Sequence, residues 1–280
     1  MKVSVLVPVY RTDPGHLREA ISSVLGQSFC DFELLIQDDC PDDDRASVVA
    51  EFKDPRISYR ANERNLGISA TRNLLLARAR GEYLAVFDHD DVCRPDRFEK
   101  QVAYLDAHPE CGVVSSQVRR VPQGAVTAYP TDDRGIRLAL MDHCAVWHPA
   151  AMIRRSVLEE CGVAYEAEYS PTEDYMLWMK LIGRTRFANL PEALTDYRWH
   201  ETNTSVLRKD ELDAAEMRCK AWAETHLPEL YREYLSLREV VTRYRVFGIP
   251  VLKKTENRKF VTWKLFNHIP LLTAYRRPVI

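Results

Sequence analysis

The sequence predicts an α/β fold, in which a mostly parallel β-sheet is flanked by helices on both faces. Up to about residue 115, apolar runs alternate with amphipathic stretches whose apolar residues recur at helical spacing. This alternation of strands and helices is typical of parallel sheets. The strand-like runs are almost continuously apolar, as in VSVLVPVY at residues 3–10, which is the composition of strands buried on both faces.

Each element in this first part has a local justification. Apolar residues, among them Leu17 and Ile21, recur at helical spacing along residues 15–27. A later helix is entered through Gly67, and another is opened by Pro95, a residue type favoured at the first position of a helix. The pattern predicts strands at 3–10, 32–39, 56–62, 82–88 and 111–116, and helices at 15–27, 67–80 and 94–108 and after the polar turn 40–44.

Beyond residue 130 the alternation becomes looser. We expect strands at 145–155 and 192–200, and a helix at 170–182, where SPTEDYMLWMKLI has a strong helical pattern. From about residue 210 onward the pattern is helical. The sequence therefore predicts one large domain over residues 1–208 and a helical C-terminal extension over residues 209–280.

The composition is that of a soluble globular protein. Of the 280 residues, 46% are apolar and 29% are charged, and the formal net charge of −2 gives no argument for a nucleic-acid partner. The chain starts directly with a predicted strand, so we expect no secretory signal, and no apolar run approaches the roughly 18 to 20 residues of a membrane-spanning helix. The seven cysteines are scattered without a C-x-x-C pair, which favours reduced thiols in the cytoplasm over disulfides or a zinc site.

Polar clusters follow three of the predicted strands at the point where each strand ends. Residues 8–10 close the first strand, residues 38–39 the second, and the acidic run 88–91 the strand at 82–88. Ligands of such sheets bind beyond the carboxyl ends of the strands. We therefore expect the three clusters to converge on one crevice.

The run Asp88-His89-Asp90-Asp91 places three carboxylates within four residues, and such charges repel one another unless a cation lies among them. One interpretation is a solvated loop in which Asp91 or Asp96 caps the following helix. The other is a D-x-D metal site, because carboxylate oxygen is the preferred ligand of Mg²⁺ and Mn²⁺. Since Mg²⁺ completes its shell with water and phosphate oxygens, the metal would bridge to a diphosphate.

Six motifs occur in the order seen in one known family. They are VSVLVPVY with AISSVLGQSF, FELLIQDD, NLGISATRN, GEYLAVFDHDD, TEDYMLWMKL and YRWHETNTS. Over residues 2–205 the chain therefore resembles the family 2 glycosyltransferases of the GT-A fold. The resemblance implies a Rossmann-like catalytic domain over 1–208, with a nucleotide-binding half (1–115) and an acceptor-binding half (116–208). It also implies an inverting transferase that uses a nucleotide-diphosphate sugar, which we expect to be a UDP-sugar, with Mn²⁺ or Mg²⁺ as cofactor.

The resemblance assigns the donor site residue by residue. Asp39 matches the acid that hydrogen-bonds the nucleotide base. Pro8 and Tyr10 match the loop that packs on that base, and Arg72 matches a helix residue near the nucleotide. Family members often have Gly-Ser after the acid, whereas residues 40–41 of this chain are Cys-Pro, so the identity of the nucleotide stays open.

The metal site follows from the same correspondence. Asp88 and Asp90 match the D-x-D, with Asp90 the expected direct ligand and Asp88 nearer the ribose, and Asp91 could share either task. In YRWHETNTS, His200 either completes the metal shell or joins Arg198 on the diphosphate, for which a guanidinium is well suited. The alternative for His200 is a structural role in the strand.

Two acids open the predicted helix at 170–182. Ser170 and Glu173 have the spacing of a capping box, and Pro171 suits the first helical position, so we expect Glu173 to cap the helix. Asp174 is then free for chemistry, and it matches the aspartate that family members use as general base. We expect the helix dipole to keep Asp174 ionised at neutral pH and to make it a weaker base.

The acceptor-side candidates are His148, Glu173 and Trp178. His148 matches an acceptor-side position in relatives, while a turn residue before Pro149 is an equal alternative. The face of Trp178 suits a sugar ring, but burial in the core explains this residue equally well. The sequence leaves the donor sugar, the acceptor and the linkage open.

The segment 253–280 carries seven Lys or Arg against one Glu, with apolar and aromatic residues between them. Such a segment suits an anionic membrane surface, which fits a lipid-linked glycan acceptor. The alternative is a helix packed on protein, either on this chain or on a second subunit of a homo-oligomer. We therefore expect a cytoplasmic protein, either free or peripheral at the inner face of the membrane.

The function we expect is transfer of a sugar to a glycan or lipid-linked glycan in bacterial surface polysaccharide biosynthesis. A sugar nucleotidyltransferase would share the alternating architecture and the acids, but VPVYRTDPGH does not resemble a glycine-rich phosphate loop. A dinucleotide-binding oxidoreductase needs G-x-G-x-x-G, which the chain lacks. A non-catalytic sugar-nucleotide-binding or scaffold protein of the same fold is the remaining alternative.

Overall fold

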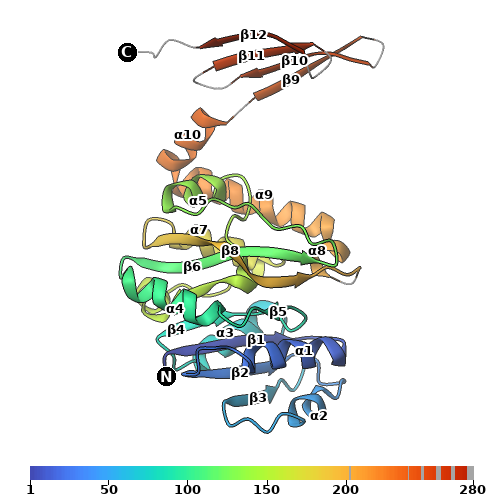
Figure 1. Ribbon diagram of the computed structural model, residues 1–280, viewed down its shortest axis with the longest axis vertical. Coiled ribbons are helices and arrows are strands. Elements are labelled where there is room, and N and C mark those ends of the chain that lie inside the picture. The colour runs from blue at the N-terminus through green and yellow to red at the C-terminus, as the bar shows by residue number, and fades with distance from the viewer. Residues whose placement is uncertain (202, 239, 247–248, 257–259, 266–268, 276–280) are drawn as a thin grey trace. The chain divides into compact units, whose positions relative to one another are not determined.

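The computed structural model describes residues 1–201, 203–238, 240–246, 249–256, 260–265 and 269–275 (Figure 1). The chain divides into two compact units, Met1–Trp222 and Ala223–Ile280, and each is described by itself. None of the helices within the described ranges has the length and apolar character needed to cross a bilayer.

The first unit is built on an eight-stranded sheet. Its strands are β1 (Val3–Val9), β2 (Phe32–Asp38), β3 (Ile57–Ala61), β4 (Tyr83–Val86), β5 (Val92–Cys93), β6 (Cys111–Val121), β7 (Met152–Arg154) and β8 (Arg186–Arg198), in the order β3-β2-β1-β4-β7-β6-β8-β5. The pairs β1–β2, β1–β4, β2–β3 and β6–β8 are parallel. Strand β7 pairs antiparallel with β4 and β6, and β5 pairs antiparallel with β8. The predicted α/β class with a mostly parallel sheet is confirmed.

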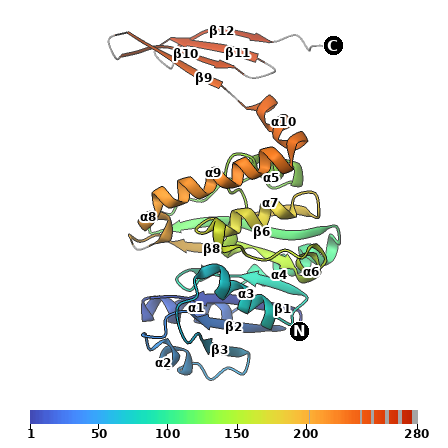
Figure 2. The ribbon, with the colours of Figure 1, turned by 180° about the vertical axis from the view of Figure 1, so that it is seen from behind.

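Helices cover both faces of this sheet. Figure 1 shows α4 in front of the strands, and Figure 2, seen from behind, shows α3 and α7 in front of them. The helices of this unit are α1 (Pro14–Leu25), α2 (Arg45–Ala50), α3 (Ile68–Arg78), α4 (Arg97–Ala107), α5 (Asp133–Leu140), α6 (Arg155–Cys161), α7 (Glu173–Leu181), α8 (Thr204–Leu207) and most of α9 (Lys209–His226), with 3-10 turns η1 (His148–Ala150) and η2 (Ala167–Tyr169).

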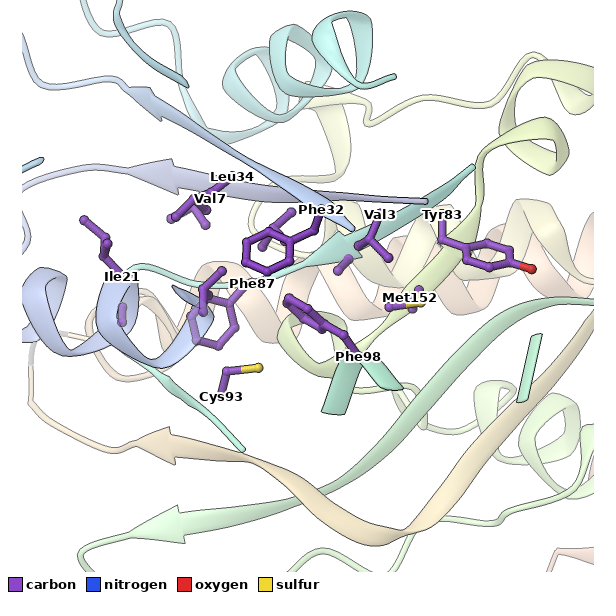
Figure 3. Packing of buried hydrophobic residues seen from close by; sticks show 14 of the residues in the cluster. Val3, Val7, Ile21, Phe32, Leu34, Tyr83, Phe87, Cys93, Phe98 and Met152 are labelled. Carbon is purple, nitrogen blue, oxygen red and sulfur yellow. The ribbon is translucent and has the colours of Figure 1, made fainter. Parts of the chain in front are cut away.

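The core of this unit lies where β1, β2 and β4 meet α1 and α4. Phe32 of β2 and Phe98 of α4 pack edge to face, with ring centroids 5.7 Å apart and an interplanar angle of 74° (Figure 3), a geometry that aromatic pairs favour. Val7 of β1, Ile21 of α1 and Phe87 complete the contact and are buried. This packing holds β1, β2 and β4 against α1 and α4.

Arg97, the first residue of α4, is completely buried and makes no salt bridge within the described residues. Its guanidinium donates to the backbone oxygens of Val86 (2.9 Å), Pro149 (2.8 Å) and Ala151 (3.1 Å). These carbonyls belong to β4, to η1 and to the residue that leads into β7. One side chain therefore ties two chain segments, the end of β4 and the connection from η1 to β7, to α4.

The second part of the sheet differs from the prediction in detail. A continuous strand at 145–155 is wrong, because the chain forms the turn η1 before the three-residue strand β7. Pro149 lies inside this turn and has no N–H to donate to a strand ladder. Strand β8 in turn begins at Arg186, six residues before the predicted start of that strand.

The first compact unit extends beyond residue 208, because α9 packs on the segment around η2 and α7. The Cys219 sulfur lies 3.6 Å from Thr172 Oγ1, and Arg218 donates to the Glu168 backbone oxygen at 3.2 Å. The helical character predicted for the start of the extension is confirmed by α9.

In the second unit, α10 (Pro228–Leu237) is helical as predicted, but the predicted helix beyond it is wrong. The chain forms a four-stranded antiparallel sheet of β9 (Val240–Val246), β10 (Ile249–Glu256), β11 (Phe260–Leu265) and β12 (Ile269–Tyr275), in the order β12-β11-β10-β9 (Figure 2). Runs such as VVTRYRV and FVTWKL are rich in β-branched and aromatic residues, which favour strands. The predicted membrane segment 253–280 includes 257–259, 266–268 and 276–280, which lie outside the described residues.

Replacing Arg97 with methionine should lower the free energy of unfolding by about 3 kcal/mol or more, because each buried carbonyl left without a donor costs about 1–3 kcal/mol. Urea unfolding followed by circular dichroism measures the change. Arg186→Met is the matched control, since Arg186 is 67% exposed and lies 3.8 Å from Glu110. We expect that control to change stability by about 0.5 kcal/mol at most. Wild-type stability of the Arg97→Met variant would contradict the role of this side chain.

Candidate active site

The ends of β1, β2 and β4 lie side by side, as the sequence predicts for parallel strands. The backbone N–H of Asp39 donates to the Val9 oxygen at 2.8 Å, and that of Phe87 donates to the Leu6 oxygen at 3.1 Å. The three polar clusters that follow these strands are therefore neighbours along one edge of the sheet. The acidic run 88–91 begins directly after this last contact.

The end of β8 folds onto the acidic run from the other side. His200 Nε2 lies 3.0 Å from Asp90 Oδ2. Arg198 Nε donates to the backbone oxygen of Asp90 at 2.9 Å, and the backbone N–H of Arg198 donates to Asp91 Oδ1 at 2.9 Å. The pairing of β5 with β8, in which Val92 faces Asp196, brings these two segments together.

Burial opposes the ionisation of two carboxyl groups in the acidic run. It raises the pKa of Asp88, an effect that the nearby Arg72 guanidinium opposes and Asp90 reinforces. It raises the pKa of Asp91 well above its ordinary value, with Asp90 and Asp88 adding to the shift. Asp91 Oδ2 is buried and has no hydrogen-bond partner among the described residues. A positive charge at this place would therefore be strongly stabilised.

These residues fit a divalent cation. Across the described residues, no three His, Cys, Asp or Glu side chains form a ready-made metal centre, but Mg²⁺ and Mn²⁺ are commonly held by one or two protein groups plus phosphate and water oxygens. Asp90 and His200 supply a carboxylate and an imidazole that face each other. Of the other predicted ligands, Asp88 lies near Arg72 and Asp91 is held by the backbone of Arg198.

Arg72 links the acidic run to helix α7. Its guanidinium is 10% exposed, with Nη1 2.5 Å from Glu173 Oε1 and Nη2 3.6 Å from Asp88 Oδ1. The prediction that Glu173 caps α7 is wrong: Thr172 occupies the N-cap position, and the Glu173 carboxylate is buried against Arg72. Charge pairing with a buried guanidinium outweighs the local capping geometry, because an unpaired buried charge is costly.

Asp174 follows Glu173 and lies partly exposed at the start of α7. Burial within its surroundings raises the pKa of Asp174 to about 7, and the neighbouring Glu173 adds to the shift, while Arg72 and the N–H of Tyr175 oppose it. The predicted effect of the helix dipole, an ionised carboxyl that is a weaker base, is outweighed, because burial raises the pKa of Asp174. Desolvation exceeds the effect of the dipole here.

The predicted base-binding residues take different positions at the sheet edge. Asp39 is buried, and its carboxylate accepts hydrogen bonds from Asn62 Nδ2 (2.7 Å) and from the N–H groups of Leu66 (2.7 Å) and Gly67 (2.9 Å). Gly67 has φ 84°, a conformation that favours glycine. Asp39 therefore shapes the loop that enters α3. Pro8 is buried in β1, whereas Tyr10 is 41% exposed.

The acceptor-side candidates His148 and Trp178 are both buried. His148 Nε2 lies 2.8 Å from the Tyr165 hydroxyl, and the ring of Trp178 lies next to the imidazole, with centroids 5.7 Å apart. Burial holds the pKa of His148 well below its ordinary value, so the ring stays neutral. Of the two alternatives for Trp178, the structure supports the core position.

Sequence reasoning missed several residues that support this edge. Arg97 lies beneath the acidic run, and its charge partly offsets the rise in the pKa of Asp91. Thr12, His16 and Glu19 reach the site from α1 and the residues before it. The spacing of His16 and Glu19, three residues apart on one helix face, was the available signal.

The fold and this site define a glycosyltransferase of the GT-A type. The family model described as Glycosyl transferase family 2 matches residues 4–162, and the chain belongs to this family. It is 30% identical over 206 residues to an uncharacterized glycosyltransferase of Methanocaldococcus jannaschii, with 70% of each chain covered. It is also 26% identical over 212 residues to the Escherichia coli UDP-Glc:alpha-D-GlcNAc-diphosphoundecaprenol beta-1,3-glucosyltransferase WfgD, with 75% of this chain and 82% of WfgD covered.

Solved structures show the same fold. S. aureus TarS 1–349 in complex with UDP-GlcNAc matches with a TM-score of 0.69 at 22% identity, covering 84% of this chain and 72% of TarS 1–349. The mannosyltransferase PcManGT from Pyrobaculum calidifontis, in complex with GDP-Man and Mn²⁺, matches with a TM-score of 0.60 at 18% identity, covering 83% of this chain and 72% of that one. At these identities the likeness concerns the fold alone.

The raised pKa of Asp174 predicts a pH-dependent stability. The folded carboxyl titrates near 7 and the unfolded one near its ordinary 3.8, so the unfolded chain ionises first and stability falls as pH rises through this window. Asparagine does not titrate. We therefore follow the melting temperature of Asp174→Asn minus that of the wild type. This difference should increase between about pH 4 and pH 7 and level off at higher pH. A difference that does not vary with pH would contradict this assignment.

Proposed function

We propose that this protein is an inverting glycosyltransferase that moves a sugar from a nucleotide-diphosphate sugar, specifically a UDP-sugar, to a hydroxyl of a glycan or lipid-linked glycan in bacterial surface polysaccharide biosynthesis. Family membership supports the transferase activity, the name of WfgD supports the donor and acceptor classes, and the UDP-GlcNAc bound to TarS supports the donor class. One observation carries the proposal: Arg72 lies between Asp88 of the D-x-D and Glu173 beside Asp174. The donor side and the base side thus meet at one guanidinium.

The sheet edge binds the donor in this proposal. Tyr10, exposed beyond β1, packs on the nucleotide base, while Asp39 holds the loop 62–67 beside it and hydrogen-bonds the base through its remaining acceptor capacity. Asp88 lies nearest the ribose. This division follows the order of the strand ends, with the base beyond β1 and β2 and the diphosphate beyond β4.

The diphosphate lies between the acidic run and the end of β8. A divalent cation, Mn²⁺ or Mg²⁺, held by Asp90 and His200, would neutralise the diphosphate and stabilise it as a leaving group. Arg198, which contacts Asp90, donates to the diphosphate beside the cation. The acids suit the cation that a nucleotide diphosphate carries, and the arginine suits the negative oxygens of the diphosphate itself.

Asp174 accepts the proton of the acceptor hydroxyl. A carboxyl with a pKa of about 7 is substantially ionised at neutral pH and is a stronger base than an ordinary aspartate. As the proton moves to Asp174, the acceptor oxygen forms a bond to the anomeric carbon, and the bond from that carbon to the diphosphate oxygen breaks with its electron pair. Attack from the face opposite the leaving group inverts the carbon.

The acceptor approaches on the side of α7. Because His148 and Trp178 are buried, they support the surroundings of Asp174 in this proposal and do not touch the acceptor. In this proposal the protein binds peripherally to the inner face of the membrane, where its basic segment 253–280 contacts anionic lipid. The reason is that the acceptor named for WfgD is lipid-linked.

Donor binding tests the proposal directly. We expect the melting temperature to rise with UDP or a UDP-sugar in the presence of Mn²⁺ or Mg²⁺, and EDTA to remove the rise, because the acidic run alone repels a diphosphate. Asp90→Ala should abolish the metal-dependent rise. Glu51→Ala, at an exposed acid paired with Arg18, is the control and should retain it. No rise with any nucleotide sugar would argue for a scaffold protein.

Asp174→Asn should lower kcat by about 10²–10⁴-fold without weakening donor binding, because general base catalysis contributes about that much. The kcat of the wild-type protein should rise with pH up to about 7 and then level off, since only the ionised carboxylate accepts a proton. A coupled assay of UDP release measures both. Near-normal turnover of the variant with intact donor binding would overturn the assignment of the base.

A further inference from the structure

Thr12, two residues before α1, and one face of the helix itself contact the acidic run and the end of β8. Thr12 Oγ1 hydrogen-bonds His89 Nδ1 within that run. The rings of His16 and His200 stack with centroids 5.9 Å apart and an interplanar angle of 29°. Glu19 forms an ion pair with Arg198. Together with Thr12 before it, α1 makes three separate contacts to one site, so it is positioned to orient the side chains that it touches.

The contact of Glu19 fixes the guanidinium of Arg198. Arg198 Nη2 donates to the Glu19 carboxylate, and Nε donates to the Asp90 backbone oxygen at 2.9 Å. Nη1 makes no hydrogen bond within the described part of the chain. Two of the three nitrogens are therefore held by protein, while the third is left to donate to a ligand beside the acidic run.

Stability alone does not account for this ion pair. The Glu19 side chain is 61% exposed and that of Arg198 is 24% exposed, and exposed ion pairs contribute little to folding. The neighbouring residue Arg18 makes a comparable exposed pair with Glu51 of the α2 segment. The pairs differ in what the arginine also touches, because only Arg198 contacts the acidic run.

We propose that Glu19 is a positioning residue that holds Arg198 ready for the diphosphate of the donor. The inference rests on the proposed function, since it assigns Glu19 to the diphosphate end of that site. An arginine that is already fixed loses less conformational freedom when it binds an anion than a free one does. Glu19 itself stays outside contact with the donor and acts through the Arg198 guanidinium.

The test is the dissociation constant of UDP in MnCl₂, measured by calorimetry on the full chain. We expect Glu19→Gln to weaken binding about three- to tenfold, the range that corresponds to one immobilised side chain. Glu51→Gln, which removes the exposed pair on the other side of α1, should bind UDP as the wild type does. Glu19→Asp should recover part of the loss. With a UDP-sugar as substrate, Glu19→Gln should raise the donor KM by a similar factor and leave kcat nearly unchanged.

A double-mutant cycle separates positioning from a general structural effect. If Glu19 acts through Arg198, then Glu19→Gln combined with Arg198→Ala should bind UDP no more weakly than Arg198→Ala alone. Additive losses, or wild-type affinity of Glu19→Gln, would overturn the inference while leaving the proposed function intact. Failure of the wild-type protein to bind UDP and every other nucleoside diphosphate would instead overturn both.

Discussion

The buried guanidinium of Arg97 is the interaction on which the site depends. It binds the carbonyl oxygens where β4 ends and where η1 leads into β7, and these are the segments that present the acidic run and His148. Its cation also lies close enough to Asp91 and Asp88 to interact with both carboxyls. The repulsion among the three acids is therefore reduced by more than a bound ligand. The positive charge of Arg97 beneath the loop already offsets part of it before any ligand binds.

Helix α3 connects the acidic run to helix α7. Arg72 pairs with Glu173 on α7, and its neighbour Asn73 exchanges two hydrogen bonds with the backbone of Tyr165, at 2.8 and 3.0 Å. Beside these contacts, burial raises the pKa of Asp174 and Glu173 adds to the shift, while Arg72 opposes it. Burial that raises the pKa of a carboxyl costs folding stability. A carboxyl with a pKa near 7 is well suited to general base catalysis at neutral pH. The same packing that joins α3 to α7 thus sets the electrostatic surroundings of Asp174.

The sequence was informative wherever local pattern determines structure. Parallel strands end at one edge, so the convergence of Tyr10, Asp39 and the acidic run followed from the order of apolar runs. The partner of Glu173 lies 101 residues away in the sequence, and no local pattern distinguishes such a partner from a helix cap. The helix predicted for the C-terminal segment was wrong for another reason. Its basic and aromatic residues suit an amphipathic helix and an alternating strand equally, and only the enrichment in β-branched residues favoured the strands.

Three arginines of the site differ in how much of each side chain remains available to a ligand. Arg97 is completely buried and is engaged by carbonyl oxygens. Arg72 is 10% exposed and bridges two acids, with its Nε buried and without a partner among the described residues. The Arg198 side chain is 24% exposed, and its Nη1 makes no hydrogen bond with the described residues. An arginine whose donors are all bonded to protein serves folding, whereas one with a donor left over can also bind a ligand. Along this edge, the side chains become more available from Arg97 through Arg72 to Arg198.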